Sequence, residues 1–245
     1  LPKELLEQNC VISLSKMKTH ALERITGAVK NSYGFVYGFH KAKGHTQYPS
    51  ADSFARMLID LNKCVAPKLY VMDGIVAMEG NGPGSGDPVQ MNVMLMSTDP
   101  VALDSVFSRL VYLKPEMVPT NYHGEKMGLG TWKEEEITLL TPDGEISMSE
   151  AVKRYGNPQF NVDRTEVRKN IWTRMAGALN IFQKKPYIEA DKCVRCGICV
   201  QSCPVPGKAV DFRKGKGKPP VYDYKKCIRC FCCQEMCPKK AIKVK

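Results

Sequence analysis

The sequence lacks any apolar run long enough to cross a membrane. A membrane-spanning helix needs about 20 consecutive apolar residues, whereas the longest apolar stretches here lie near residues 69–78 and 101–113. No signal-peptide pattern is visible, and the sequence opens with Leu1-Pro2-Lys3-Glu4 rather than with Met. We therefore predict a cytoplasmic protein with no membrane span, and we expect that a further segment precedes Leu1.

The composition excludes a disordered chain and a small disulfide-stapled domain. Of the 245 residues, 43% are hydrophobic and 25% are charged, so the chain can form one large or two modest domains with their own cores. The net charge of +11 is concentrated at one end, because residues 187–245 hold 14 Lys or Arg against 5 Asp or Glu. Nine of the 11 cysteines lie between Cys193 and Cys237. The C-terminal quarter is therefore predicted to be a separate domain.

Short β-rich runs alternate with helix-like stretches before that quarter. The β-rich runs cover residues 11–14, 69–73, 92–97 and 137–140, and helical patterns cover residues 53–63, 100–112 and 149–155. Such alternation is typical of an α/β layer architecture. Thr98 and Asp99 are placed to cap the helix that Pro100 begins. We predict an α/β domain over residues 1–162, incomplete at its N-terminus.

A helical connector is predicted over residues 163–186. Its apolar residues are spaced three or four apart, at Val167, Ile171, Met175, Leu179 and Phe182. Pro186 ends the pattern. Residues 187–245 are then expected to form a small α+β domain.

One cysteine spacing occurs twice in this small domain. The runs are Cys193-x2-Cys196-x2-Cys199-x3-Cys203-Pro204 and Cys227-x2-Cys230-x2-Cys233-x3-Cys237-Pro238. In this spacing the fourth cysteine of each run ligates the cluster of the other run. We therefore predict two [4Fe–4S] clusters, one on Cys193, Cys196, Cys199 and Cys237, and the other on Cys203, Cys227, Cys230 and Cys233.

Disulfide bonds and zinc are the alternatives. Disulfide bonds would need an oxidising compartment, and structural zinc usually takes pairs of Cys-x2-Cys hairpins rather than these triplets. The spacing resembles that of the bacterial two-cluster ferredoxins, over residues 187–244. The segment from Cys203 to Val210 is two residues longer than the matching segment from Cys237 to Ile242, so the two clusters are expected to have different surroundings.

The basic charge of the C-terminal quarter favours an acidic redox partner protein, because long-range attraction raises encounter rates. Nucleic acid is a weaker interpretation, since no aromatic stacking platform is interleaved with this charge. Exposed clusters lose iron once they are oxidised, so we expect a reducing, low-oxygen setting. The oligomeric state is left open by the sequence.

The most unusual N-terminal segment is Glu79-Gly80-Asn81-Gly82-Pro83-Gly84-Ser85-Gly86. Alternating glycines allow a ligand to approach the backbone closely. The segment is not a dinucleotide fingerprint, since no G-x-G-x-x-G register opens a helix. Because it follows a predicted strand, it is expected at the ligand crevice of an open sheet. A purely structural turn is the alternative.

A second polar constellation follows the predicted strand at residues 11–14. Lys16, Lys18 and His20 are followed by Lys30 and Asn31, a set that suits anion binding or proton transfer. Exposed surface residues are the alternative. The predicted substrate-binding residues are Lys16, Lys18, Lys30, Asn31, Gly80, Asn81, Gly82 and Gly84. The predicted proton-transfer residues are His20, Glu79 and Asp99.

Together these segments resemble the family called domain of unknown function 362. The resemblance is carried by Lys16-x-Lys18-Thr19-His20, by residues 26–31 and 73–83, and by residues 97–104. Members often end in a two-cluster ferredoxin module, and Cys230-Phe231-Cys232-Cys233 resembles their second motif. The resemblance implies a missing segment before Leu1, because the Lys-Thr-His segment lies well inside the family's domain. The chemistry of the family is not established.

Three functions are compatible with these features. The first is a redox enzyme or assembly factor whose clusters pass electrons to a ligand in the α/β domain, and the fusion favours it because tethering raises the effective concentration of the donor. The second is a non-catalytic electron carrier or binding protein. The third is an iron–sulfur sensor or regulator, although no recognition helix is evident. A flavin is compatible with the sequence but no residue requires one.

Overall fold

The structure is a computed structural model of the chain, and it describes residues 1–37, 39–166 and 184–244. The chain divides into two compact units, Leu1–Asp163 and Arg164–Lys245. Most of the helical connector predicted over residues 163–186 lies outside the described residues.

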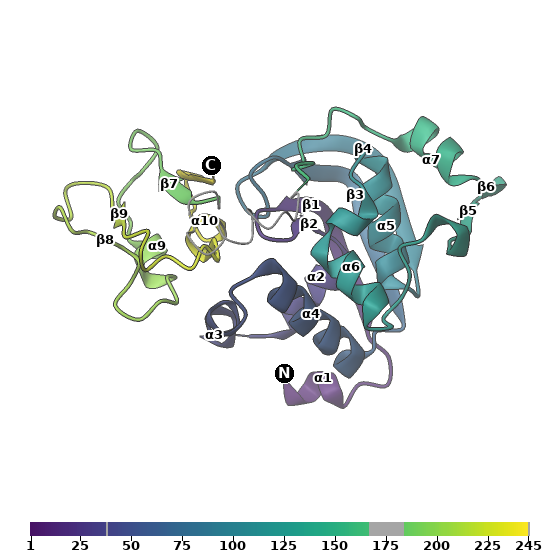
Figure 1. Cartoon of the computed structure of the whole chain (residues 1–245), viewed down its shortest axis with the longest axis horizontal. Coiled ribbons are helices and arrows are strands. Elements are labelled where there is room, and N and C mark those ends of the chain that lie inside the picture. Colours follow the sequence, from purple (N-terminus) through teal and green to yellow (C-terminus); the bar gives the residue numbers. More distant parts are fainter. Residues whose placement is uncertain (38, 167–183, 245) are drawn as a thin grey trace, which may run out of the picture. The chain divides into compact units, whose positions relative to one another are not determined.

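A four-stranded mixed sheet forms the centre of the first unit (Figure 1). The strand order is β2-β1-β3-β4. β1 (Ile12–His20) runs parallel to β3 (Leu69–Glu79), whereas β2 (Arg24–Thr26) is antiparallel to β1, and β4 (Asp87–Ser97) is antiparallel to β3. This sheet and its helices confirm the predicted α/β fold class.

Helices connect the strands and cover one face of the sheet. Between β2 and β3 lie α2 (Ala28–Asn31), η1 (Ser32–Phe35), α3 (Phe39–Gln47) and α4 (Ala51–Val65). After β4 come α5 (Pro100–Leu110), η2 (Pro115–Met117), α6 (Pro119–Lys126), η3 (Glu134–Glu136), β5 (Leu139–Thr141), β6 (Gly144–Ile146) and α7 (Met148–Tyr155), and α1 (Lys3–Leu6) precedes β1. Asp99 caps α5 and Pro100 occupies its first turn, as predicted.

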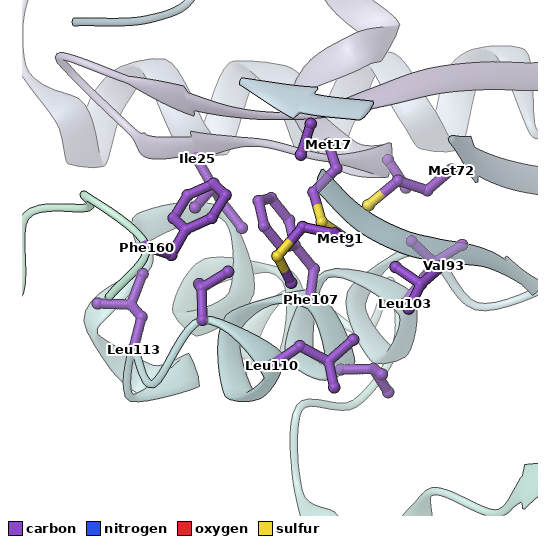
Figure 2. Close-up of a cluster of buried hydrophobic side chains, with 14 of the residues drawn as sticks. Met17, Ile25, Met72, Met91, Val93, Leu103, Phe107, Leu110, Leu113 and Phe160 are labelled. Carbon is purple, nitrogen blue, oxygen red and sulfur yellow. The ribbon is translucent and has the colours of Figure 1, made fainter. Parts of the chain in front are cut away.

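The main core lies between the sheet and α5 (Figure 2). The sheet contributes Met17, Met72, Met91 and Val93, and α5 contributes Leu103, Phe107 and Leu110. A second cluster joins α2 and α4 to the first turn of α5 through Val29, Tyr33, Phe54, Leu58, Ile59 and Val101. Burial of these side chains stabilises the layered arrangement, at roughly 1.5–3 kcal/mol for each large apolar side chain.

The other face of the sheet is open in the part of the chain that the structure describes. Its apolar side chains are half or more exposed, at Ile12, Leu14, Ile75, Met94 and Met96. Leu14, Val71 and Met96 lie in one row across β1, β3 and β4. Side chains alternate between the two faces along each strand. Met17 and Met72, which lie on the face covered by helices, are therefore buried.

Several predicted strand boundaries are wrong, and one of them is the start of β4, which lies at Asp87 rather than at Asn92. β1 continues to His20 rather than ending at Leu14, so the Lys-Thr-His segment lies within the strand and not after it. β3 likewise continues past Asp73 to Glu79. The run predicted over residues 137–140 begins at Leu139 and pairs with β6 in a separate hairpin. In β1 the residues facing the core include Ser13, Ser15 and Thr19. Because these residues are polar, β1 lacks the alternation of apolar and polar residues from which a strand is predicted.

The second unit is small and built from short elements. β7 (Pro186–Ile188) pairs with β10 (Ile242–Val244), and β8 (Val210–Asp211) pairs with β9 (Val221–Tyr222). One-turn helices α9 (Ile198–Gln201) and α10 (Cys232–Glu235) complete it. This arrangement confirms the predicted small α+β, ferredoxin-like fold class.

No helix among the described residues has both the length and the apolar character that a membrane span requires.

Candidate functional site

Both cysteine runs fold into the same backbone shape. Arg195 and Arg229, each placed before the second cysteine, have φ angles of 59° and 56°. Gly197 and Phe231, each placed after it, have φ angles of 79° and 60° and are the N-cap residues of α9 and α10. The left-handed conformation costs a residue with a Cβ atom roughly 1–2 kcal/mol. The second run therefore keeps this shape although it has Phe231 where the first has glycine.

The cysteines of the two runs line two separate cavities. One cavity is lined by Cys193, Cys196, Cys199 and Cys237. The other cavity is lined by Cys203, Cys227, Cys230 and Cys233. Each cavity thus takes three cysteines from one run and the fourth from the other. This is the grouping that the spacing predicts, and ligation of iron by these sulfurs stays a prediction. We call the first of these cavities the Cys193 cavity and the second the Cys203 cavity.

The cysteines of each group surround a cavity rather than a shared point. Among the described residues, no group of three or more His, Cys, Asp or Glu side chains could by itself hold a metal ion. A [4Fe–4S] cluster is larger than one ion and is held by four thiolates. The two cavities therefore have the ligand number and ligand type that this cluster needs.

Each cavity also has a backbone N–H donor for the sulfur of its fourth cysteine. Ala209 N donates to Cys203 Sγ and Ala241 N donates to Cys237 Sγ, both at 3.3 Å. The two extra residues after Cys203 therefore leave this contact unchanged. Donors to cluster sulfurs favour the more negative, reduced state.

The remaining lining of each cavity is mostly apolar. Ile188, Ile198 and Ile242 line the Cys193 cavity, and Val205, Val210 and Phe231 line the Cys203 cavity. Burial raises the pKa of the Cys199 thiol to about 11, and it raises the pKa of the Cys227 and Cys233 thiols as well. Bound iron must displace these protons, because the thiolate is the ligand.

A side-chain hydroxyl donates to a cysteine sulfur of the Cys203 cavity. The Tyr222 hydroxyl, on β9, donates to Cys233 Sγ at 3.1 Å. Burial, followed by the neighbouring Cys233, raises the pKa of Tyr222 well above its usual range. The phenol is therefore protonated and can donate.

In the first unit, the carboxyl ends of β1 and β3 lie side by side. Lys18 of β1 is opposite Met78 of β3. The Thr19 hydroxyl donates to Gly80 O at 3.0 Å and accepts from Gly82 N at 3.2 Å. The Lys-Thr-His segment and the glycine segment, which are far apart in the sequence, are thus in contact.

The glycine segment packs tightly against the ends of β1 and β3. A Cβ atom at Gly82 would lie 2.3 Å from Thr19 O, and a Cβ atom at Gly86 would lie 2.2 Å from Glu79 O. Gly80 has a φ of 72°. Both interpretations of this segment, a tight turn and a ligand site, need glycines here. The exposed Gly84 and the half-buried Asn81 complete the turn from β3 to β4.

The predicted proton-transfer residues all make backbone contacts. His20 is buried, and its Nδ1 accepts from Leu22 N and Glu23 N at 3.1 Å each. Glu79 Oε2 accepts from Asn161 N at 2.8 Å. These two residues lie at the carboxyl ends of β1 and β3.

Asp99 lies at the start of α5. Its Oδ1 accepts from Val101 N and Ala102 N at 2.7 and 2.9 Å, and its Oδ2 accepts from Thr131 N at 2.9 Å. The helix cap accounts for the two contacts of Oδ1, and the contact of Oδ2 joins Asp99 to the segment that follows α6. A role for Asp99 in proton transfer stays a prediction.

The predicted basic residues differ in their exposure and in the contacts that they make. Lys16 forms an ion pair with Asp73 at 2.6 Å on the open face of the sheet, and this pair lowers the pKa of Asp73. Lys18 is half-buried near the carboxyl end of β1, and Lys30 is half-buried on α2. Asn31 Nδ2 donates to Leu14 O at 2.9 Å, so Asn31 satisfies a backbone carbonyl of β1.

Sequence reasoning missed Glu23. This residue lies between β1 and β2 and is fully buried, and in the described part of the chain neither of its carboxylate oxygens has a hydrogen-bond partner. Burial raises the pKa of Glu23 well above its usual range, and Lys30 opposes that shift. A buried carboxyl group with a perturbed pKa is a common mark of a functional site. The sole sequence signal is an acidic residue three positions after His20.

Comparisons with known proteins agree with this division of the chain. Residues 1–109 match the family described as a domain of unknown function (DUF362), and residues 185–238 match the family described as a 4Fe-4S dicluster domain. These are the two families that the motifs predicted, and the iron–sulfur match supports an electron-transfer role for the second unit. The first unit is called the DUF362 domain below, after the match of residues 1–109.

One curated relative is the thylakoid-associated protein sll1697 of Synechocystis sp. It is 41% identical to this chain over 130 residues, which make up 53% of this chain and 40% of that protein. The match thus covers less than half of the relative's length. No solved structure matches this chain.

Proposed function

We propose that this protein is an oxidoreductase or assembly factor in which two [4Fe–4S] clusters exchange electrons with a ligand bound by the DUF362 domain. The observation that carries the proposal is the division of eight cysteines between two cavities of four. When bound, each cluster takes up or releases one electron. Cys193, Cys196, Cys199 and Cys237 would hold one cluster, and Cys203, Cys227, Cys230 and Cys233 would hold the other.

The carboxyl ends of β1 and β3 are the proposed ligand site. Lys18 and Lys30 supply positive charge, and backbone N–H groups of the glycine segment supply donors, so a small anionic or polar substrate fits their chemistry. His20 and Glu79 would move the protons that accompany reduction of an organic molecule. Together with His20 and Glu79, the buried Glu23 is a third side chain of this region that can take up or release a proton.

A non-catalytic carrier is the second candidate. Two observations favour it: Thr19 packs directly against Gly82, and His20 and Glu79 already accept from backbone N–H groups. In this case the DUF362 domain would bind a partner and the iron–sulfur domain would carry the electrons.

An acidic redox protein is the proposed electron partner. The exposed lysines Lys214, Lys216 and Lys218 lie in one loop, and Arg195 donates to Gly217 O in that loop at 3.1 Å. Pro220, at the end of the loop, lines the Cys193 cavity. The loop is therefore held beside this cavity, where its charge would attract an acidic donor. We further propose a reducing, low-oxygen cytoplasm as the setting.

The test begins with protein reconstituted without oxygen and reduced with dithionite. Small anions that can be reduced, such as unsaturated carboxylates and redox-active oxoanions, are then added as electron acceptors, and reoxidation is followed by the return of visible absorbance. Lys18→Ala and Glu79→Gln should abolish reoxidation by any compound that the parent accepts. Lys68→Ala, at the amino end of β3, removes one exposed positive charge and should behave like the parent. Equal reoxidation in all four proteins would favour the carrier instead.

A further inference from the structure

The two halves of the iron–sulfur domain are related by an internal repeat. In one half Ile242 of β10 pairs with Ile188 of β7, and in the other Val210 of β8 pairs with Tyr222 of β9. Ile188 stands five positions before Cys193, and Tyr222 stands five positions before Cys227. Ile188 and Tyr222 are therefore equivalent residues.

These equivalent residues contact their cavities differently. Ile188 lines the Cys193 cavity and has no hydrogen-bonding group in its side chain. Tyr222 lines the Cys203 cavity and donates to Cys233 Sγ. The backbone donors of Ala209 and Ala241 are equal in length, so they do not distinguish the cavities. The Tyr222 hydroxyl does.

A neighbouring ring holds Tyr222 in place. The rings of Tyr222 and Tyr224 stack, with centroids 5.6 Å apart and planes 15° apart. The Tyr224 hydroxyl donates to Pro186 O at 2.9 Å rather than to a sulfur. The phenol of Tyr222 is thus fixed against Cys233 by contacts that do not involve its own hydroxyl.

Positively charged side chains line the Cys193 cavity, and they too favour the reduced state of the cluster held there. Arg195 and Lys239 line the Cys193 cavity and favour a reduced cluster there. Both side chains are exposed, so water and salt screen their effect. A hydrogen bond made directly to a ligand sulfur is not screened in this way.

We propose that Tyr222 is a tuning residue that raises the reduction potential of the cluster held in the Cys203 cavity. This inference rests on the proposed pair of [4Fe–4S] clusters. A hydroxyl that donates to a ligand sulfur stabilises the extra negative charge of the reduced cluster more than the oxidised one. The Cys193 cavity has no such residue at the equivalent position, Ile188.

The test is a redox titration of the full chain, reconstituted without oxygen and followed by electron paramagnetic resonance. Tyr222→Phe should lower the potential of one cluster and leave the other unchanged. The expected change is up to about tenfold in the equilibrium constant of one-electron reduction, which corresponds to about 59 mV. Tyr224→Phe is the matched control, since it removes a hydroxyl that does not contact sulfur, and it should leave both potentials unchanged.

Three outcomes would overturn the inference. The first is parental potentials in Tyr222→Phe, and the second is an equal shift in Tyr224→Phe. The third is loss of iron from Tyr222→Phe alone, because the hydroxyl would then be needed to bind the cluster rather than to tune it. Failure of the parent chain to bind iron and sulfide is a different result, which would contradict the proposed function itself.

Discussion

The carboxylate of Asp104 lies directly against the backbone of Gly27. A Cβ atom at position 27 would lie 1.9 Å from Asp104 Oδ1. Asp104 is fully buried, and it accepts from Ala28 N and Val29 N at 2.5 and 3.1 Å. One side chain on α5 thus holds the start of α2, and the close approach requires glycine.

Gly27→Ala should therefore destabilise the DUF362 domain by about 2 kcal/mol, because the added methyl group pushes Asp104 away from its two donors. Gly34→Ala is the matched control, since a Cβ atom at Gly34 would meet nothing within 4 Å. Urea unfolding followed by tryptophan fluorescence measures both. A loss of stability no larger in Gly27→Ala than in Gly34→Ala would contradict the packing described.

The stability of the DUF362 domain should fall as the pH rises from about 4 to about 7. Burial raises the pKa of Asp104 from 3.8 to about 7, against the opposing effect of its two backbone donors, and burial also raises the pKa of Glu23. In this window the folded domain keeps protons that the unfolded chain has released, so ionisation favours unfolding, by roughly a few kcal/mol for Asp104.

Asp104→Asn tests this pH dependence. The variant should be less stable overall, because an amide has one acceptor oxygen and can accept fewer hydrogen bonds from the backbone N–H groups. Its stability should, however, change less between pH 5 and pH 8. Urea unfolding at both pH values gives the comparison. A slope equal to that of the parent would contradict the raised pKa of Asp104, and Glu23→Gln then reports the separate contribution of Glu23.

Much of the fold could be predicted from sequence, and the failures have specific causes. The alternation of strands and helices identified the α/β class, and Asp99-Pro100 located the start of α5. The end of β1 was misplaced because Ser13, Ser15 and Thr19 face the core, so polarity did not mark the outer face. A buried polar residue in a strand cannot be recognised without its partners.

The iron–sulfur domain was more predictable than the DUF362 site. Three cysteines of each predicted group lie close together in one run, and the repeated motif assigns the fourth to the other run. The cavities group the same cysteines. The contacts of Thr19 with Gly82 and of Asp104 with Ala28 join residues 63 and 76 positions apart. Such pairings depend on strand order and register, which a single sequence does not specify.

The basic loop should speed reduction by anions. Replacing Lys214, Lys216 and Lys218 with Gln should slow reduction by dithionite severalfold at low salt, because the attraction that raises encounter rates is lost. Reduction by the radical cation of methyl viologen should not slow. A triple Gln variant at Lys3, Lys68 and Lys153 controls for total charge. Equal effects on both reductants would contradict electrostatic steering.

Cys232→Ser should keep both clusters. Cys232 adjoins Cys233, but it is not among the described residues that line either cavity. Iron and acid-labile sulfide should stay near eight of each per chain, the content of two [4Fe–4S] clusters. Loss of about half of the iron would make Cys232 a ligand and contradict the assignment.

The iron content of two double variants tests the crossed ligation most directly. Cys203 and Cys233 line one cavity although they come from different runs, whereas Cys199 and Cys203 come from one run but line different cavities. After reconstitution without oxygen, Cys203→Ser/Cys233→Ser should keep one cluster, with about four iron per chain, and Cys199→Ser/Cys203→Ser should keep almost none. The reverse result, with iron lost from the first variant and half retained by the second, would contradict the account.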